Sequence, residues 1–392
     1  MIDSLFATLE RDPDDLDTYL VLADALTRAG DPRGELIAIQ HALATRSDVD
    51  RGALVAREAE LVAARKRTLD SVVHRQAVGL NFRLGFLDQV TLRSGLASLE
   101  LPRILCALFG SPESRLLRGI AIEFDEAQAD EDRFHALVAQ LRDGSQAAPA
   151  SLRRLVLGRD YERNPRCRVS TDYLYDRSDK LLGVFDVFPS IEELRVDLVA
   201  NLEWEPLVSD RLRRFCYVCP HCHDHELEQF VASRLPALES LVLWTGGQYV
   251  VDPEGAAPWL QPLPASVDFE DGIAAADLVP LLAMLARSPA LRELGICNFA
   301  GHFADLADVL ANSPVLDRIA SLDLSACRVA ERDSATLHAL LDRAPNLRTL
   351  KIANAEIGPS VLVELRARSG LAIVGEPAGE LHRPYRYFVT ME

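Results

Sequence analysis

A short apolar pattern recurs along this chain and restricts its fold more than any other feature. The clearest copies, with an apolar residue at positions one, four and six, are LRELGI from Leu291, IASLDL from Ile319 and LRTLKI from Leu347, so the pattern repeats every 28 residues. Such internal periodicity predicts an array of structural repeats. Earlier copies with irregular spacing start at Leu87, Leu117, Leu152, Ile191, Leu212 and Leu238.

Each copy of the pattern predicts a strand followed by a helix. Alternate side chains of a strand face the same side, so positions four and six point into the core together. The segments from Leu306 and from Leu337 have the apolar spacing of a helix and end at Pro314 and Pro345. One strand and one helix cannot bury their apolar faces alone, so neighbouring repeats must stack with parallel strands. Because helices are wider than strands, we expect an α/β solenoid, curved as a horseshoe with the strands on its concave side.

The chain divides into three predicted parts. Residues 1–78 have helical apolar spacing, with Asp14 or Asp15 as an N-cap and a break near Gly30–Pro32, and predict an all-helical N-terminal domain that packs on the first repeat. Its last helix is expected from about Arg51 to Arg75. Residues 79–370 are expected to form the repeat array, with insertions near 158–180 and 245–276, and residues 371–392 to cap its last repeat.

Composition and charge narrow the classes of partner and compartment. The 392 residues carry a formal net charge of −17, which disfavours a general nucleic-acid binder. No apolar stretch approaches the length of a membrane span, and acids occupy the start where a secretory leader would be basic. The seven cysteines are scattered. We expect a cytoplasmic protein that binds neither membranes nor nucleic acid.

Two segments resemble known families. The strand pattern in residues 291–352 resembles the ribonuclease-inhibitor type of leucine-rich repeat, in which Asn or Cys follows LxxLxLxx; the copy from Ile319 fits through Cys327, whereas the other two copies depart at Phe299 and Ala355. Residues 23–40 resemble a small repeat-companion domain of bacterial proteins. The matching residues are Ala23, Asp24, Gly30, Asp31, Pro32, Arg33, Gly34 and Glu35. The first resemblance implies protein binding, and neither implies a catalytic activity.

A cluster of cysteines and histidines is the candidate metal site. Thiolates and imidazoles at this spacing can hold zinc, although structural zinc sites usually draw ligands from two separated segments. The alternative is a strand that leads into a polar loop: Phe215 and Tyr217 then take core positions and Cys216 faces the other side. The candidate ligands are Cys216, Cys219, His221, Cys222, His223 and His225.

The concave face is the candidate binding site. Positions three, five and seven of each strand point there, and interface hot spots favour Trp and Arg, so Trp244, Arg195 and Arg214 are the first candidates. We found no catalytic or cofactor-binding motif. The sequence therefore favours a non-enzymatic scaffold without a cofactor that binds a protein; the alternative is an enzyme or metal protein that uses the Cys/His cluster. The candidate binding residues are Arg154, Glu193, Arg195, Asp197, Arg214, Trp244, Glu293, Asp323 and Lys351.

Overall fold

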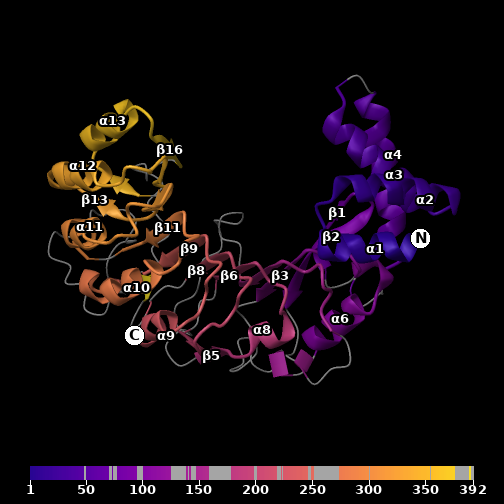
Figure 1. Ribbon diagram of the computed structural model, residues 1–392, viewed down its shortest axis with the longest axis horizontal. Helices are drawn as coiled ribbons and strands as arrows, with labels where there is room; N and C mark the ends of the chain where they lie inside the picture. Colours follow the sequence, from indigo (N-terminus) through magenta and orange to yellow (C-terminus); the bar gives the residue numbers. More distant parts are fainter. Residues whose placement is uncertain are drawn as a thin grey trace. The chain divides into compact units, whose positions relative to one another are not determined.

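The chain is an α/β protein whose main sheet has 11 strands (Figure 1). The computed structural model describes residues 1–47, 50–69, 73, 77–94, 100–124, 138–139, 141–142, 147–158, 178–197, 201–218, 222, 224–245, 249–250, 273–299, 301–353, 355–375 and 388–389. These residues contain 11 α-helices, none of which is long and apolar enough to cross a lipid bilayer. The chain forms an N-terminal unit (Met1–Arg159 with Gly183–Ile191) and a C-terminal unit (Asp160–Leu182 with Glu192–Glu392).

The N-terminal unit begins with helices whose ends are fixed by short polar residues. The Asp15 carboxylate accepts a hydrogen bond from the Thr18 amide at the start of the second helix, and Asp31 does the same for Arg33 at the start of the third. Between them Gly30 adopts φ +72°, the left-handed conformation that ends a helix and favours glycine. The break predicted near Gly30–Pro32 is confirmed. The helices are α1 (Ile2–Arg11), α2 (Leu16–Arg28), α3 (Pro32–Thr45) and α4 (Arg51–Lys66).

A β-hairpin follows these helices, and it was not predicted. Strand β1 (Ala77–Arg83) pairs antiparallel with β2 (Phe86–Ser94) through a two-residue turn, in which Leu84 and Gly85 have φ values of 45° and 79°. Positive φ at both central residues is typical of a hairpin turn. The expectation that residues 1–78 are entirely helical is therefore wrong at its end, where β1 begins, and the expected helix from Arg51 to Arg75 ends at Lys66.

The rest of the N-terminal unit continues the sheet with parallel strands. Its strand order is β1-β2-β3-β4. A buried cluster under α1, α2 and the hairpin includes Phe6, Leu22 and Phe86. The remaining elements are α6 (Glu100–Phe109), the short 3₁₀ helix η1 (Pro112–Ser114), β3 (Gly119–Phe124), β4 (Arg154–Gly158) and α8 (Val184–Val187).

The C-terminal unit is a parallel sheet whose strands follow the order of the chain. Its order is β6-β8-β9-β11-β12-β14-β16. Every strand predicted from a motif that starts between Leu117 and Leu347 is present, and each begins two residues after that motif's first Leu or Ile. The strands are β6 (Glu193–Asp197), β8 (Arg214–Val218), β9 (Ser240–Trp244), β11 (Glu293–Cys297), β12 (Ser321–Asp323), β14 (Thr349–Lys351) and β16 (Ala372–Val374).

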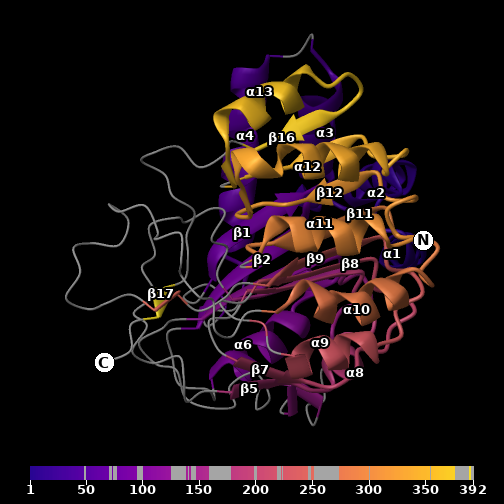
Figure 2. The ribbon, with the colours of Figure 1, turned by 90° about the vertical axis from the view of Figure 1, so that its left-hand side faces the viewer.

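Helices cover one face of this sheet. Motif positions four and six are buried beneath them, as Leu294 and Ile296 show at 1% and 0% exposure. Helices α9 to α12 follow one another along that face (Figures 1 and 2), and α11 and α12 confirm the helices predicted before Pro314 and Pro345. The helices are α9 (Asp224–Val231), α10 (Leu278–Leu285, preceded by η5, Ala275–Asp277), α11 (Phe303–Ala311), α12 (Ser334–Asp342, preceded by η6, Glu331–Asp333) and α13 (Pro359–Ala367).

Three short parallel pairs accompany the main sheet of this unit. The predicted insertions near 158–180 and 245–276 lie largely outside the described residues. The pairs are β5 (Ser178–Leu181) with β7 (Asn201–Trp204), β10 (Tyr249–Val250) with β17 (Phe388–Val389), and β13 (Arg328–Val329) with β15 (Glu356–Ile357).

The turns that lead into the strands are built alike. In three motifs an arginine at position two donates from Nη1 to the carbonyl three residues before it and to the carbonyl of the preceding Leu. These arginines are Arg153, Arg292 and Arg348. The same hydrogen bonds recur although the spacing between the motifs differs, so each turn is a local structure set by its own sequence.

Candidate functional site

Strand alternation separates a buried face from an exposed face in the C-terminal sheet. In β9, Leu241 and Leu243 are buried, whereas Val242 and Trp244 on the other side are partly exposed. The register aligns Trp244 with Cys297 and Val242 with Gly295 on β11. In β9 the face opposite the core therefore carries motif positions five and seven in partly exposed form, whereas in β11 the corresponding Gly295 and Cys297 are buried.

Glu293 is the centre of a polar network on this exposed face. Its carboxylate accepts a hydrogen bond from Ser240 Oγ on β9 at 2.7 Å and another from Lys351 Nζ on β14. The Arg214 guanidinium on β8 lies 3.9 Å from the same carboxylate. A single half-buried carboxylate thus connects side chains from four strands. The sequence motif places these residues at neighbouring positions, but it does not show that they interact.

The network keeps both of its central groups charged. Burial acts to raise the pKa of Glu293, but hydrogen bonds from Lys351 and Ser240 and the charges of Lys351 and Arg214 outweigh it, so this pKa lies below its usual value. Burial likewise acts to lower the pKa of Lys351, but its hydrogen bond to Glu293 and the negative charges of Glu293 and Asp323 raise it. Neither group therefore changes its charge near neutral pH.

We expect Glu293→Gln to destabilise the protein by about 1–2 kcal/mol at neutral pH, because Lys351 then lacks its carboxylate partner at a partly exposed site. A carboxylate with a lowered folded-state pKa stabilises the fold above its unfolded pKa of about 4.3 and loses that contribution as the pH falls through the folded value. The difference from the wild type should therefore shrink in acid. Urea unfolding between pH 7 and pH 3 measures it, with Glu228→Gln on α9 as an exposed control. If the stability difference between Glu293→Gln and the wild type did not change with pH, the ionised state of Glu293 would not be its cause.

The other predicted face residues lie in different environments. Arg214 is exposed, Glu193 and Arg195 on β6 are partly exposed, and Arg154 begins β4 in the N-terminal unit. Asp197 ends β6, and its side chain lies outside the described part. Asp323, a predicted binding residue of the concave face, is only 9% exposed, and its Oδ1 accepts a hydrogen bond from the Ser325 amide at 3.0 Å.

The Cys/His cluster lies only partly within the described residues. Cys219, His221 and His223 fall outside them. Cys216 lies on the exposed face of β8 between Arg195 and Val242 in register, as the strand interpretation requires. Within the described residues, the ligand types form no group of three that could hold a metal ion. Metal binding by the complete cluster stays a prediction. The other two members differ in exposure: Cys222 is buried and His225, on α9, is exposed.

Two further cysteines of the C-terminal unit are buried. Burial raises the pKa of Cys297 well above its ordinary value and that of Cys327 to about 12. Both thiols are therefore protonated and unreactive at neutral pH. Cys327 Sγ donates to the Ile296 carbonyl at 3.2 Å, so it links its own repeat to the preceding one.

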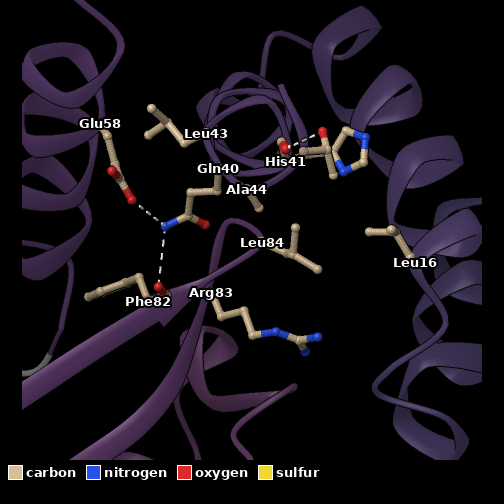
Figure 3. Close-up of a pocket in the computed structure, with 10 residues that line it drawn as sticks. Leu16, Gln40, His41, Leu43, Ala44, Glu58, Phe82, Arg83 and Leu84 are labelled. Atoms are coloured by element: carbon tan, nitrogen blue, oxygen red, sulfur yellow. Dashed lines mark hydrogen bonds between the residues drawn. The ribbon is translucent and has the colours of Figure 1, made fainter. Parts of the chain in front are cut away.

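A cavity of about 480 Å³ lies in the N-terminal unit between α3, α4 and the hairpin (Figure 3). Gln40 lines this cavity and bonds to both the helices and the hairpin. Its side-chain amide donates to Glu58 Oε1 at 2.8 Å and to the Phe82 carbonyl at 3.2 Å, and its side-chain oxygen accepts from the Gly85 amide at 2.9 Å. These hydrogen bonds attach the hairpin to the helices. The rest of the lining is mostly apolar and includes Leu16, Leu43 and Leu84.

No family model and no curated protein matches this sequence. Among solved structures, the fold is similar to that of a protein from Bacteroides fragilis, with a TM-score of 0.52 and 17% sequence identity over 83% of this chain and 84% of that chain. At this identity the likeness concerns the fold alone. It agrees with a repeat-like α/β architecture built on a long, mostly parallel sheet.

Proposed function

We propose that this protein is a non-enzymatic binding scaffold of the leucine-rich-repeat type, and that the exposed sheet face of its C-terminal unit binds a protein partner. The repeat class is supported by strands that follow the motif in chain order and by arginine-capped turns that recur between motifs. Cys327 supports it further, because it occupies the Asn/Cys position of the motif and bonds to the preceding repeat.

The observation that carries the proposed function is the network around Glu293. Lys351, Ser240 and Arg214 keep the Glu293 carboxylate ionised, and Glu293 and Asp323 keep the Lys351 amine protonated, so neither group is poised for general acid–base chemistry. Fixed charges with a defined geometry instead suit recognition, because they set the register of a partner and oppose mismatched partners. Trp244, partly exposed on the same face, adds the apolar area that hot spots use.

The chain's charge favours a protein over a nucleic acid as the partner of this face. The net charge of −17 would repel a phosphate backbone, and the exposed face itself mixes both signs of charge. A protein surface can match such a mixed pattern residue by residue.

Hydrogen exchange of the complex tests this proposal. A partner captured by the full chain from its source cells would be purified and added back, and the amide exchange of the chain compared with and without it. We expect slower exchange in strands β8, β9 and β11 and unchanged exchange in helices α10 to α12, which cover the other face. Protection confined to these helices or to the N-terminal unit would overturn the proposed binding face.

A further inference from the structure

A second surface of the C-terminal unit lies at the edge where its parallel strands begin. We call the residues at motif position two the entry edge. The amide of each one bonds to the carbonyl of the one before it at 2.7–2.8 Å, so they form a row with the spacing of the strands, about 4.8 Å. In order they are Glu192, Arg213, Glu239, Arg292, Ala320 and Arg348.

The N-terminal unit shows what binds an arginine at this motif position. There the residue is Arg118, which donates to Asp88 Oδ1 at 2.5 Å and to Asp14 Oδ1 at 2.8 Å. Asp14 belongs to the loop Asp12-Pro13-Asp14-Asp15 between α1 and α2, and it also lies 3.1 Å from the Arg83 guanidinium. An aspartate-rich loop therefore covers the arginine of this turn.

The corresponding arginines of the C-terminal unit have no such cover. Arg292 and Arg348 are exposed on either side of Ala320, and within the described residues neither pairs with a carboxylate. Their Nη1 atoms donate to the carbonyls of their own turns, which fixes the side chains and leaves the other donors available. Arg287 and Arg343, at the ends of α10 and α12, add two more exposed guanidinium groups.

The neighbouring turns pair their charges internally, which distinguishes this part of the edge. Arg213 lies 3.6 Å from Glu239, and Arg368 lies 2.5 Å from Asp342. The turn between Arg292 and Arg348 contributes one exposed carboxylate, Asp317. The local excess of positive charge therefore lies around Ala320, in a chain whose net charge is −17.

We propose that the arginines around Ala320 bind an aspartate-rich segment of a protein partner, in the way that Asp14 binds Arg118. A guanidinium presents its donors in a planar fork that matches a carboxylate, and two fixed forks match two carboxylates. The acidic groups elsewhere on the chain repel a long polyanion that passes near them. They repel a short acidic loop only weakly, because most of them lie farther from it than the screening length of about 8 Å. This site is separate from the sheet face, so a loss of binding through Trp244 would not decide it.

Fluorescence anisotropy with a labelled peptide tests the proposal on the full chain. The probe carries two copies of Asp-Pro-Asp-Asp-Leu-Asp, which is the sequence of residues 12–17, and the control peptide has Asn in place of every Asp. We expect the acidic peptide to bind, the Asn peptide to bind at least tenfold more weakly, and the affinity to fall as salt rises. The double variant R292E/R348E should lose at least tenfold in affinity, and R292Q/R348Q should lose most of it without adding repulsion.

The matched control is R28E/R67E, which reverses two exposed arginines of the N-terminal unit and should bind the peptide as the wild type does. Circular dichroism confirms that every variant is folded. Equal binding by the wild type and R292E/R348E would overturn the proposal, and so would no binding of the acidic peptide. Tighter binding of a fifteen-residue oligothymidylate, or of phosphatidylserine vesicles, would also overturn it and would indicate a phosphate-bearing ligand instead.

Discussion

Replacing Trp244 with alanine is expected to weaken binding of the protein partner by about 2 kcal/mol, roughly 30-fold, with little change in stability. Trp244 ends β9 on the face opposite the buried Leu241 and Leu243, so its indole adds little to the core beneath the helices. Covering its exposed part would release water from the apolar surface of the ring. Titration calorimetry with the purified partner measures the loss.

A second tryptophan of the same unit supplies the control. Trp204 is 6% exposed and packs with its ring centroid 4.6 Å from that of Tyr217 and 5.5 Å from that of Phe215. Trp204→Ala should cost about 3–5 kcal/mol of stability, as expected for a buried aromatic side chain. If Trp244→Ala lost as much stability as Trp204→Ala and the folded variant still bound its partner, Trp244 would be a packing residue and the sheet face would lose its main anchor.

The parallel strands were predictable because their signal is local. Each motif fixes which side chains enter the core, and a shift of one residue would expose all of them, so the register follows from the pattern. For the same reason the pattern places Arg214, Ser240 and Glu293 side by side, and their alignment in the sheet confirms this. Strand starts were displaced by two residues because regular strand pairing begins at position three of the motif, one residue after the first hydrogen bond between neighbouring turns.

Features that depend on contacts between distant segments were not predictable in this way. The β1–β2 hairpin was missed because β1 lies where the helical spacing was expected to continue, although Gly85 offered a turn signal. Asp323 occupies an outward position of its strand, yet the Ser325 amide and its neighbours bury it. Burial of this kind depends on the side chains of adjacent strands, which periodicity within one strand does not describe.

A large loss of stability is also expected at Gly34, where Gly34→Ala should cost about 3 kcal/mol. A Cβ at this position would lie 2.4 Å from Thr27 Oγ1 and 2.6 Å from the Ala23 carbonyl oxygen on α2. Two of the three nearest atoms belong to the backbone of a packed helix, so the methyl group cannot be accommodated by turning a side chain. Helices α2 and α3 must therefore separate. Chemical unfolding followed by circular dichroism measures the loss.

Separation of these helices would also disturb the group that holds the helical segment on the hairpin. Arg33 is fixed by Asp31 through two hydrogen bonds of 3.0 Å from its Nε, and its guanidinium lies 5.4 Å from the Phe86 ring of β2. Gly52 on α4 is the matched control, because its Cβ would meet only Asp50 Oδ1 at 3.4 Å. Gly52→Ala should leave stability unchanged or raise it by up to about 1 kcal/mol through helix propensity. If Gly34→Ala and Gly52→Ala changed stability equally, the close approach of α2 and α3 would not be the reason for a glycine at position 34, and helix propensity alone would account for both effects.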